Sequence, residues 1–370
     1  MEFTVSKTDL VRELSLSQGV VEKKTTIPIL SNVLVEADGD RIQLTATDLE
    51  LGVRSSCPAR VGKPGAGTLP VRKLLDYVRL LPDSEISFKF GENFWANLLC
   101  GRSRTRIAGM SRESFPELPK MPAAMARLPV KLMASMISKT LFAISTEESR
   151  FTLNGALLVL NEGTIRMVAT DGHRLALVQQ SGEWNIAQPF RALLPRKAMT
   201  EILKLAQEAS ESQCLEFAGD ENHLFFQLGD RLLISRKLTG NFPDYERVLP
   251  REHPHMVTLE REQLRAAIER VAQFSDERLR AIRLRFSPGE LQLYSSLSDT
   301  GESEETLNVE YSGPKTEIGF NASYLLDFLR VAGEQEVQFG FRDASSAGEM
   351  RPSGGEEGSL YRYVVMPMRI

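Results

Sequence analysis

The chain has 370 residues, of which 42% are hydrophobic and 25% are charged, and its formal net charge is −4. At roughly 100–200 residues per domain, this length suggests two or three domains, each able to bury a core of its own. No apolar run reaches the roughly 18 residues of a membrane span, and the N-terminus lacks the pattern of a secretory signal. The three cysteines form no CxxC pair, so we expect no disulfide framework and a cytoplasmic location.

Six segments each combine a short strand with a helix, because apolar residues at helical spacing follow a strand-like run. In chain order they are residues 3–14, 69–81, 128–141, 193–206, 257–271 and 318–332. Short apolar runs bounded by turn residues predict further strands at 41–46, 85–90, 96–101, 223–228 and 336–341. The pattern predicts an α+β fold, with helices on one face of a largely antiparallel sheet.

The same elements recur three times along the chain. Alternating strands at 41–48, 164–171 and 290–299 each end in an aspartate, namely Asp48, Asp171 and Asp299. The strand-helix segments keep the same order and nearly the same spacing, and Pro-containing loops at 113–122 and 240–250 close the first two copies. We therefore predict three copies of one domain, each with two helices, over residues 1–124, 125–250 and 251–370.

Basic residues gather on or beside the predicted helices, although the whole chain is acidic. Such a face can attract the phosphates of a nucleic acid wherever the cations lie together. The chain has no aromatic platform and no zinc finger, so phosphate contacts without base reading are expected. Acidic residues on the same helices, such as Glu201 and Glu262, also fit an alternative in which these are ordinary solvated helix exteriors.

The segment TDGHRL at 170–175 is the main candidate for catalytic chemistry, because it places Asp171, His173 and Arg174 together. A general base needs a nucleophile beside it, but the sequence has no GxSxG elbow, HExxH helix or phosphate loop. The equivalent segments of the other copies, TDLELG and SDTGES, lack the histidine. We therefore expect a turn instead of a catalytic site, no enzymatic activity, and no bound metal or cofactor.

The segments IPILSNVL, ATDGHRLAL, KLTGNFPDYERVLP and YVVMPMRI, with further matches in order along the whole chain, resemble the β sliding clamp family of bacterial DNA polymerase III. The resemblance implies a head-to-tail homodimer, a ring of six similar domains with helices around a central hole. It implies a DNA-binding processivity factor for DNA replication, which encircles duplex DNA without reading its sequence. The implied partners are duplex DNA, the replicative polymerase alpha subunit, the clamp loader, and other DNA polymerases and repair proteins that carry clamp-binding peptides.

The resemblance also implies three groups of functional residues. A pocket for partner peptides between the second and third domains is expected from Leu153, Thr170, Gly172, His173, Arg174, Leu175, Pro243, Arg247, Val248, Asn321, Tyr324, Ser346, Val364, Met366, Pro367, Met368 and Arg369. The residues expected to face DNA are Lys24, Arg72, Arg79, Arg150, Arg196, Lys197 and Arg283. Those expected at the junction of two subunits are Lys73, Arg102, Arg104, Ile107, Phe274, Asp299, Glu302 and Glu305.

Two other interpretations stay open at this point. One is an accessory clamp that serves repair or drug resistance, and the other is a repeat-built peptide-binding scaffold that never touches DNA. The Gly-, Ser- and Glu-rich segment 346–359 predicts a mobile loop with no assigned role.

Overall fold

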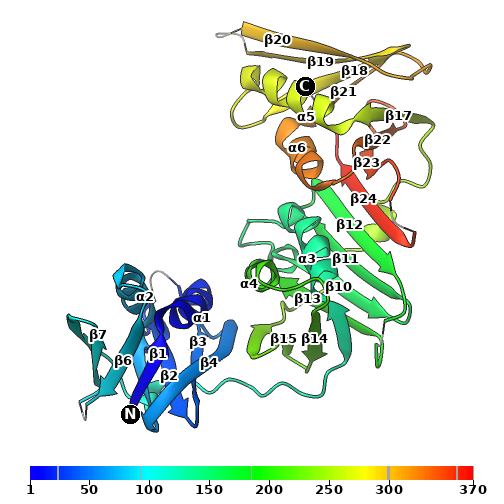
Figure 1. Ribbon diagram of the computed structural model, residues 1–370. Coiled ribbons are helices and arrows are strands. Elements are labelled where there is room, and N and C mark those ends of the chain that lie inside the picture. Colours follow the sequence, from blue (N-terminus) through cyan, green and yellow to red (C-terminus); the bar gives the residue numbers. More distant parts are fainter. Residues whose placement is uncertain (23–24, 92, 185, 298–300, 356, 370) are drawn as a thin grey trace. The chain divides into compact units, whose positions relative to one another are not determined.

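The computed structural model describes residues 1–22, 25–91, 93–184, 186–297, 301–355 and 357–369 (Figure 1). These residues form two compact units. The first consists of Met1–Ala134 and Lys197–Lys237, and the second of Ser135–Arg196 and Leu238–Ile370.

Within the described residues, one order of elements occurs three times: a strand, a helix, four strands, a second helix and three strands. The first repeat contains β1 (Glu2–Ser6), α1 (Lys7–Val20), β2 (Asn32–Asp38), β3 (Arg41–Thr47), β4 (Leu51–Lys63), β5 (Gly65–Pro70), α2 (Val71–Leu80), β6 (Glu85–Phe90), β7 (Trp95–Cys100) and β8 (Ser103–Ala108). The second contains β9 (Ala126–Pro129), α3 (Val130–Ser138), β10 (Gly155–Asn161), β11 (Thr164–Thr170), β12 (Arg174–Ser181), β13 (Phe190–Pro195), α4 (Arg196–Gln207), β14 (Cys214–Gly219), β15 (His223–Leu228) and β16 (Arg231–Arg236). The third contains β17 (His255–Glu260), α5 (Arg261–Val271), β18 (Ala281–Ser287), β19 (Glu290–Leu297), β20 (Gly301–Asn308), β21 (Thr316–Asn321), α6 (Ala322–Val331), β22 (Glu336–Phe341), β23 (Gly348–Pro352) and β24 (Ser359–Val365).

This repetition confirms the predicted fold class, since each repeat has two helices and its strands pair antiparallel. Short 3-10 turns at Pro28–Ser31, Phe151–Leu153 and Tyr245–Arg247 connect some of these elements. Two pairs of helices pack together: α1 lies against α2, and α5 lies against α6. Each turns an apolar face inward, as α2 does with its buried residues Leu74, Leu75 and Val78.

Polar side chains at the ends of strands start several of the helices. Ser6, Glu260 and Asn321 end β1, β17 and β21, and each side chain accepts hydrogen bonds from N–H groups two or three residues further on. Such caps satisfy backbone donors that have no partner in the first turn of a helix. The transition from strand to helix is thus set locally, at equivalent positions of the repeats.

Strand pairing joins each repeat to the next. In the first unit, β4 pairs with β16 from Leu51 opposite Ser235 to Arg54 opposite Leu232. In the second unit, β12 pairs with β24 from Arg174 opposite Val365 to Gln180 opposite Ser359. Both ladders connect the fourth strand of one repeat to the last strand of the following repeat, so the two junctions are built in the same way.

Two strands that belong to this pattern lie at sheet edges. Among the described residues, β20, the fourth strand of the third repeat, pairs with β19 alone. In the same part of the chain, β8, the last strand of the first repeat, pairs with β7 alone. Exposed strand edges are templates for pairing with another chain.

Side chains reinforce the junction between β4 and β16. The Glu13 carboxylate of α1 is 2% exposed and binds the Arg231 guanidinium of β16 through Oε1 at 2.8 Å and Oε2 at 3.1 Å. Lys197 at the start of α4 donates to Val20 O at 2.7 Å and pairs with Asp48. A buried pair of this kind contributes mainly by fixing geometry, because losing one partner leaves a desolvated charge behind.

The segment 346–359 differs from the expected mobile loop. Residues Gly348–Pro352 form β23, which pairs with both β22 and β24. Gly348, Glu349 and Met350 are buried, so the prediction of a loop was wrong over these residues. The Gly and Ser residues of the segment belong largely to the turn that follows β23. The strand β23 itself lacks the alternation of apolar and polar residues by which a strand is predicted from sequence.

Candidate functional site

The TDGHRL segment forms a tight turn between β11 and β12 that its own side chains hold together. Asp171 Oδ1 accepts hydrogen bonds from His173 N at 2.9 Å and Arg174 N at 3.0 Å. Thr170 Oγ1 donates to Arg174 O at 2.6 Å. Gly172 has a φ of +90°, a left-handed conformation that glycine adopts at little cost.

The first repeat contains the same turn. Asp48 Oδ1 accepts from Glu50 N at 2.9 Å and Leu51 N at 2.6 Å, and Thr47 Oγ1 donates to Leu51 O at 2.9 Å. The repeated aspartate therefore forms a turn, which explains its recurrence without any catalytic role. The third aspartate, Asp299, lies outside the described residues.

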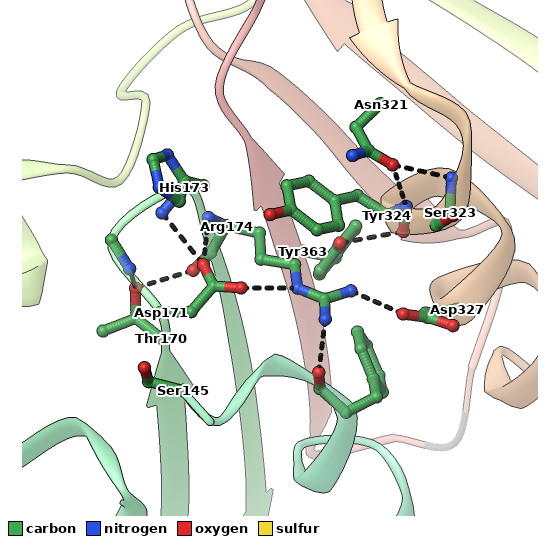
Figure 2. A network of polar contacts seen from close by, with 12 residues as sticks. Ser145, Thr170, Asp171, His173, Arg174, Asn321, Ser323, Tyr324, Asp327 and Tyr363 are labelled. Atoms are coloured by element: carbon green, nitrogen blue, oxygen red, sulfur yellow. Dashed lines mark hydrogen bonds and ion pairs between the residues drawn. The ribbon is translucent and has the colours of Figure 1, made fainter. Parts of the chain in front are cut away.

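Arg174 is the centre of a network that joins the second and third repeats (Figure 2). Its guanidinium binds Asp171 Oδ2 at 3.0 Å and Asp327 Oδ2 on α6 at 2.6 Å, and it donates to Phe142 O at 2.6 Å. It also lies over the rings of Tyr324 and Phe142, 4.3 and 5.4 Å from their centroids. With its side chain 10% exposed, Arg174 has hydrogen-bond partners on three sides and acts as a structural cation.

Tyr363 of β24 completes this network. Its hydroxyl donates to Tyr324 O at 2.8 Å (Figure 2), and burial raises the pKa of Tyr363 above its ordinary value. Burial by itself would lower the pKa of Arg174, but the neighbouring Tyr363 and Asp327 side chains raise it instead. The cluster thus keeps one charged guanidinium beside neutral phenols, which fixes β12 against α6.

A cavity of about 200 Å³ opens beside this turn. Many of the residues predicted for a peptide pocket lie around it: Leu153, Thr170, Gly172, His173, Arg174, Leu175, Pro243, Val248, Val364 and Met366. Val248 and Met366 are 46% and 44% exposed, so apolar surface is available at its rim. Its floor belongs to a buried cluster that includes Leu157, Leu177 and Phe242.

The other predicted pocket residues do not line this cavity. Their side chains or backbones have other contacts: Asn321 caps α6, Tyr324 stacks on Arg174, Arg247 binds Asp244 at 2.6 Å, Ser346 N donates to Asp343 at 2.9 Å, and Met368 N donates to Gly319 O at 2.8 Å. Pro367 is half-buried and Arg369 is exposed.

Tyr245 lines the cavity and was not among the predicted residues. It is 6% exposed, and its hydroxyl accepts a hydrogen bond from Arg166 at 2.8 Å. The signal was in the sequence, since Tyr245 follows Pro243 by two residues in the same Pro-containing loop.

A second buried charge fixes the segment that follows this loop. The Glu349 carboxylate on β23 binds Arg362 Nε at 2.6 Å, Arg351 Nε at 2.5 Å and His253 Nε2 at 2.8 Å. Arg362 also donates to Pro250 O at 2.7 Å. Burial raises the pKa of Glu349, but these hydrogen bonds outweigh it and lower the pKa to about 2. The network ties the loop that carries Pro243 and Val248 to the strand that carries Val364.

The residues predicted to face DNA lie in different environments. Arg79 and Arg196 are exposed, on α2 and at the start of α4. Three are engaged with the backbone: Arg72 donates to Val21 O at 2.8 Å, Arg150 to Asp171 O at 2.7 Å, and Lys197 to Val20 O at 2.7 Å. Arg283 lies on strand β18, beside Glu317 at 3.2 Å, and is not part of a helix face. Lys24 lies outside the described residues.

Of the residues predicted for a subunit junction, Arg102, Arg104, Ile107, Phe274, Glu302 and Glu305 lie on or beside β8 and β20. Arg102 and Arg104 are exposed beside and on β8, Lys73 is exposed on α2, and Glu302 is exposed on β20. Glu305 of β20 is bound by Arg270 through its two carboxylate oxygens, and Phe274 is half-buried next to the same strand. Ile107 is 4% exposed within the chain, so little of its side chain is available to a partner.

Among the residues that the structure describes, no three or more His, Cys, Asp or Glu side chains are grouped so that they could hold a metal ion. In the same residues, no helix is both long and apolar enough to cross a membrane.

Comparisons with known proteins give one family along the whole chain. Family models of the DNA polymerase III beta subunit match residues 1–119 (N-terminal domain), 127–244 (central domain) and 246–369 (C-terminal domain). The beta sliding clamp of Pseudomonas aeruginosa is 36% identical and covers 100% of both chains, and that of Chlamydia muridarum is 33% identical over 100% of this chain and 99% of its own. Crystal structures of the Pseudomonas aeruginosa DNA polymerase III subunit beta (36% identical) and the Caulobacter crescentus beta sliding clamp (34% identical) each have a TM-score of 0.93 and cover 100% of both chains.

The Glu349 network gives a pH-dependent prediction. Because its folded pKa of about 2 lies below the ordinary value of 4.5, Glu349 stabilises the fold above pH 4.5, and this stabilisation is lost as the pH falls towards 2. We expect Glu349→Gln to lower the melting temperature near neutral pH, and the difference from the wild type to shrink as the pH falls through that window. Thermal unfolding at a series of pH values measures this, with the exposed Glu277→Gln as a control. A difference that stays constant with pH would contradict the role assigned to the carboxylate.

Proposed function

The chain belongs to the DNA polymerase III beta subunit family, and from this premise we propose that it is a DNA sliding clamp that encircles duplex DNA. In this proposal it tethers the replicative polymerase alpha subunit, and it also binds the clamp loader and other polymerases and repair proteins that carry clamp-binding peptides. Its role is to hold these partners on DNA without catalysis of its own, in the cytoplasm. We assign its three domains to residues 1–124, 125–250 and 251–370.

One observation carries the proposal: the pairing of β4 with β16 and of β12 with β24. Both junctions use the fourth strand of one repeat and the last strand of the next. Pairing β20 with β8 of a second copy repeats this junction, and two such contacts between two copies close a ring of six repeats. A head-to-tail interface closes in this way when the rotation from one copy to the next completes a circle.

The internal junctions also suggest a register for this contact. Leu51 lies three residues after Asp48 and pairs with Ser235. Arg174 lies three residues after Asp171 and pairs with Val365. The equivalent residue of the third repeat is Glu302. Ser235 and Val365 are the last buried residues of their strands.

In β8 the equivalent residue is Ile107, the last buried residue of that strand. Transferring the register places Glu302 opposite Ile107, and Glu305 opposite Arg104. With this register, the acidic strand β20 faces the basic strand β8. Lys73 is the residue of the first repeat equivalent to Lys197, which pairs with Asp48 at the first internal junction. Exposed ion pairs contribute only about 0–1 kcal/mol each, so these charges set the register more than they hold the ring together.

The exposed cations of the helices suit a closed ring around DNA. Duplex DNA carries one charge per roughly 1.7 Å of its axis, so cations such as Arg79 and Arg196 attract it whatever its sequence. Diffuse attraction of this kind permits sliding, and retention comes from the closed ring. A net charge of −4 over the whole chain disfavours DNA binding on the remaining surface.

The cavity beside Arg174 is proposed as the site for partner peptides. Its apolar walls and few polar groups are typical of a small-peptide site, and Met366 adds a side chain that adapts to different occupants. The two ion networks around Arg174 and Glu349 hold its walls in place before a peptide binds, which lowers the entropy lost on binding.

Retention on circular DNA tests the ring directly. We expect the protein, loaded on nicked circular duplex by its clamp loader, to co-elute with the DNA in gel filtration and to be released when the circle is linearised. Arg79→Glu with Arg196→Glu should weaken loading and the salt-dependent affinity for DNA. A matched variant on strands, Arg60→Glu with Arg127→Glu, should load like the wild type. Equal release from circular and linear DNA would contradict the proposal.

The pocket is tested by placing a charge at its apolar rim. Val248→Glu should lower the affinity for a labelled peptide, Gln-rich at one end and Leu/Phe-rich at the other, by at least about tenfold, or roughly 1.4 kcal/mol. Fluorescence polarisation measures this, and Leu80→Glu, at a residue 87% exposed on α2, is the control. Unchanged affinity of the Val248→Glu variant would place the peptide elsewhere.

A further inference from the structure

The third repeat has a groove between two strands, β17 and β20. The equivalent strands of the first repeat, β1 and β4, pair directly with each other. In the first repeat, β1 pairs with the second half of β4, with Thr4 opposite Arg60 and Val5 opposite Ala59. In the third repeat the equivalent strands are β17 and β20. Among the described residues β17 pairs with β22 alone, so its other edge has no strand neighbour in that part of the chain.

The third repeat differs from the first in the segment that follows its fourth strand. β4 continues to Lys63, whereas β20 ends at Asn308 and is followed by Tyr311, Gly313 and Pro314. The Tyr311 hydroxyl donates to Pro314 O at 2.8 Å, which closes a tight turn. This turn occupies the stretch where, in the first repeat, β4 continues as a strand along β1.

The open edge borders a groove of about 680 Å³. Leu259 and Leu307 supply apolar lining, and Met256 and Thr258 contribute the free edge of β17. Glu310 and Glu336 are exposed at its rim, and neither forms an ion pair with any residue that the structure describes. The groove therefore combines a free strand edge, a partly apolar floor and a negative rim.

We propose that this groove binds an extended segment of another protein, which adds a strand to the free edge of β17. A strand added in this way gains affinity from main-chain hydrogen bonds and specificity from alternate side chains. The first repeat indicates the chemistry of the occupant, because the strand that fills the equivalent position reads Ala59, Arg60, Val61, Gly62, Lys63. The pairing with β1 skips Gly62, so Arg60 and Lys63 lie opposite Thr4 and Glu2, and Ala59 and Val61 lie opposite Val5 and Phe3. The partner segment in this way presents small apolar residues to Leu259 and Leu307, and Lys or Arg to Glu310 and Glu336.

The site is independent of the proposed clamp function. Its residues lie outside the cavity beside Arg174, and they differ from the residues of β8 and β20 assigned to the subunit junction. A partner held here could therefore stay bound while the peptide pocket is occupied.

A peptide with the sequence of residues 58–64 of this chain, PARVGKP, is the probe. Added to the full-length protein, it should slow amide hydrogen exchange in residues 255–260, and isothermal titration should detect binding that weakens with salt. Glu310→Lys with Glu336→Lys should lower its affinity at least tenfold. The charge-matched variant Glu211→Lys with Glu277→Lys should bind as the wild type does.

A second peptide, in which Glu replaces the residues equivalent to Arg60 and Lys63, separates charge pairing at the rim from simple apolar contact. The wild type should bind this peptide at least tenfold more weakly than it binds the first peptide. The Glu310→Lys, Glu336→Lys variant should bind this peptide more tightly than the wild type does. Exchange in β17 that is unaffected by the first peptide, or binding that ignores both charge reversals, would overturn the proposal. Because no step uses DNA or the clamp loader, its failure leaves the clamp function untouched.

Discussion

Backbone pairing between the fourth strand of one repeat and the last strand of the next is the interaction on which the molecule depends. β4 with β16 and β12 with β24 make this contact inside the chain. A ladder satisfies main-chain donors and acceptors that would otherwise lie exposed at two edges. Since three copies supply three fourth strands and three last strands, one of each is left over, and the free edges of β20 and β8 follow directly from the repetition.

Buried ion pairs give these junctions one geometry. Glu13 with Arg231 lies at the first junction, and Arg174 with Asp327 lies at the second. Each couples a helix of one repeat to a strand of its neighbour, and three of the four side chains are at most 14% exposed, with Asp327 at 26%. Removing one member would leave the other as an unpaired charge in a low-dielectric site, which typically lowers the free energy of unfolding by about 3–5 kcal/mol. The peptide cavity lies beside the second pair, so the same contacts that join the repeats also shape the proposed binding site.

The sequence predicted the elements and the repetition well, because apolar periodicity and caps such as Ser6 and Asn321 are local signals. It also brought together most of the residues around the cavity, through long motifs that resemble one family. It failed where the determinants are not local. β23 lacks apolar alternation because Glu349 is buried among Arg351, Arg362 and His253, and the last two lie far from it in the sequence. Among the described residues, the lack of a second strand neighbour for β17 likewise becomes visible only in three dimensions.

Cross-linking through the transferred register tests the central claim most directly. In a Cys214→Ser background, Arg104→Cys with Glu305→Cys places two thiols opposite each other, at a Cα separation that suits a disulfide. Mild oxidation should convert the 41.4 kDa chain into a covalent dimer, whereas the off-register pair Arg104→Cys with Glu310→Cys should not react. A chain that sediments as a monomer at micromolar concentration and forms no cross-link in either variant would contradict the account.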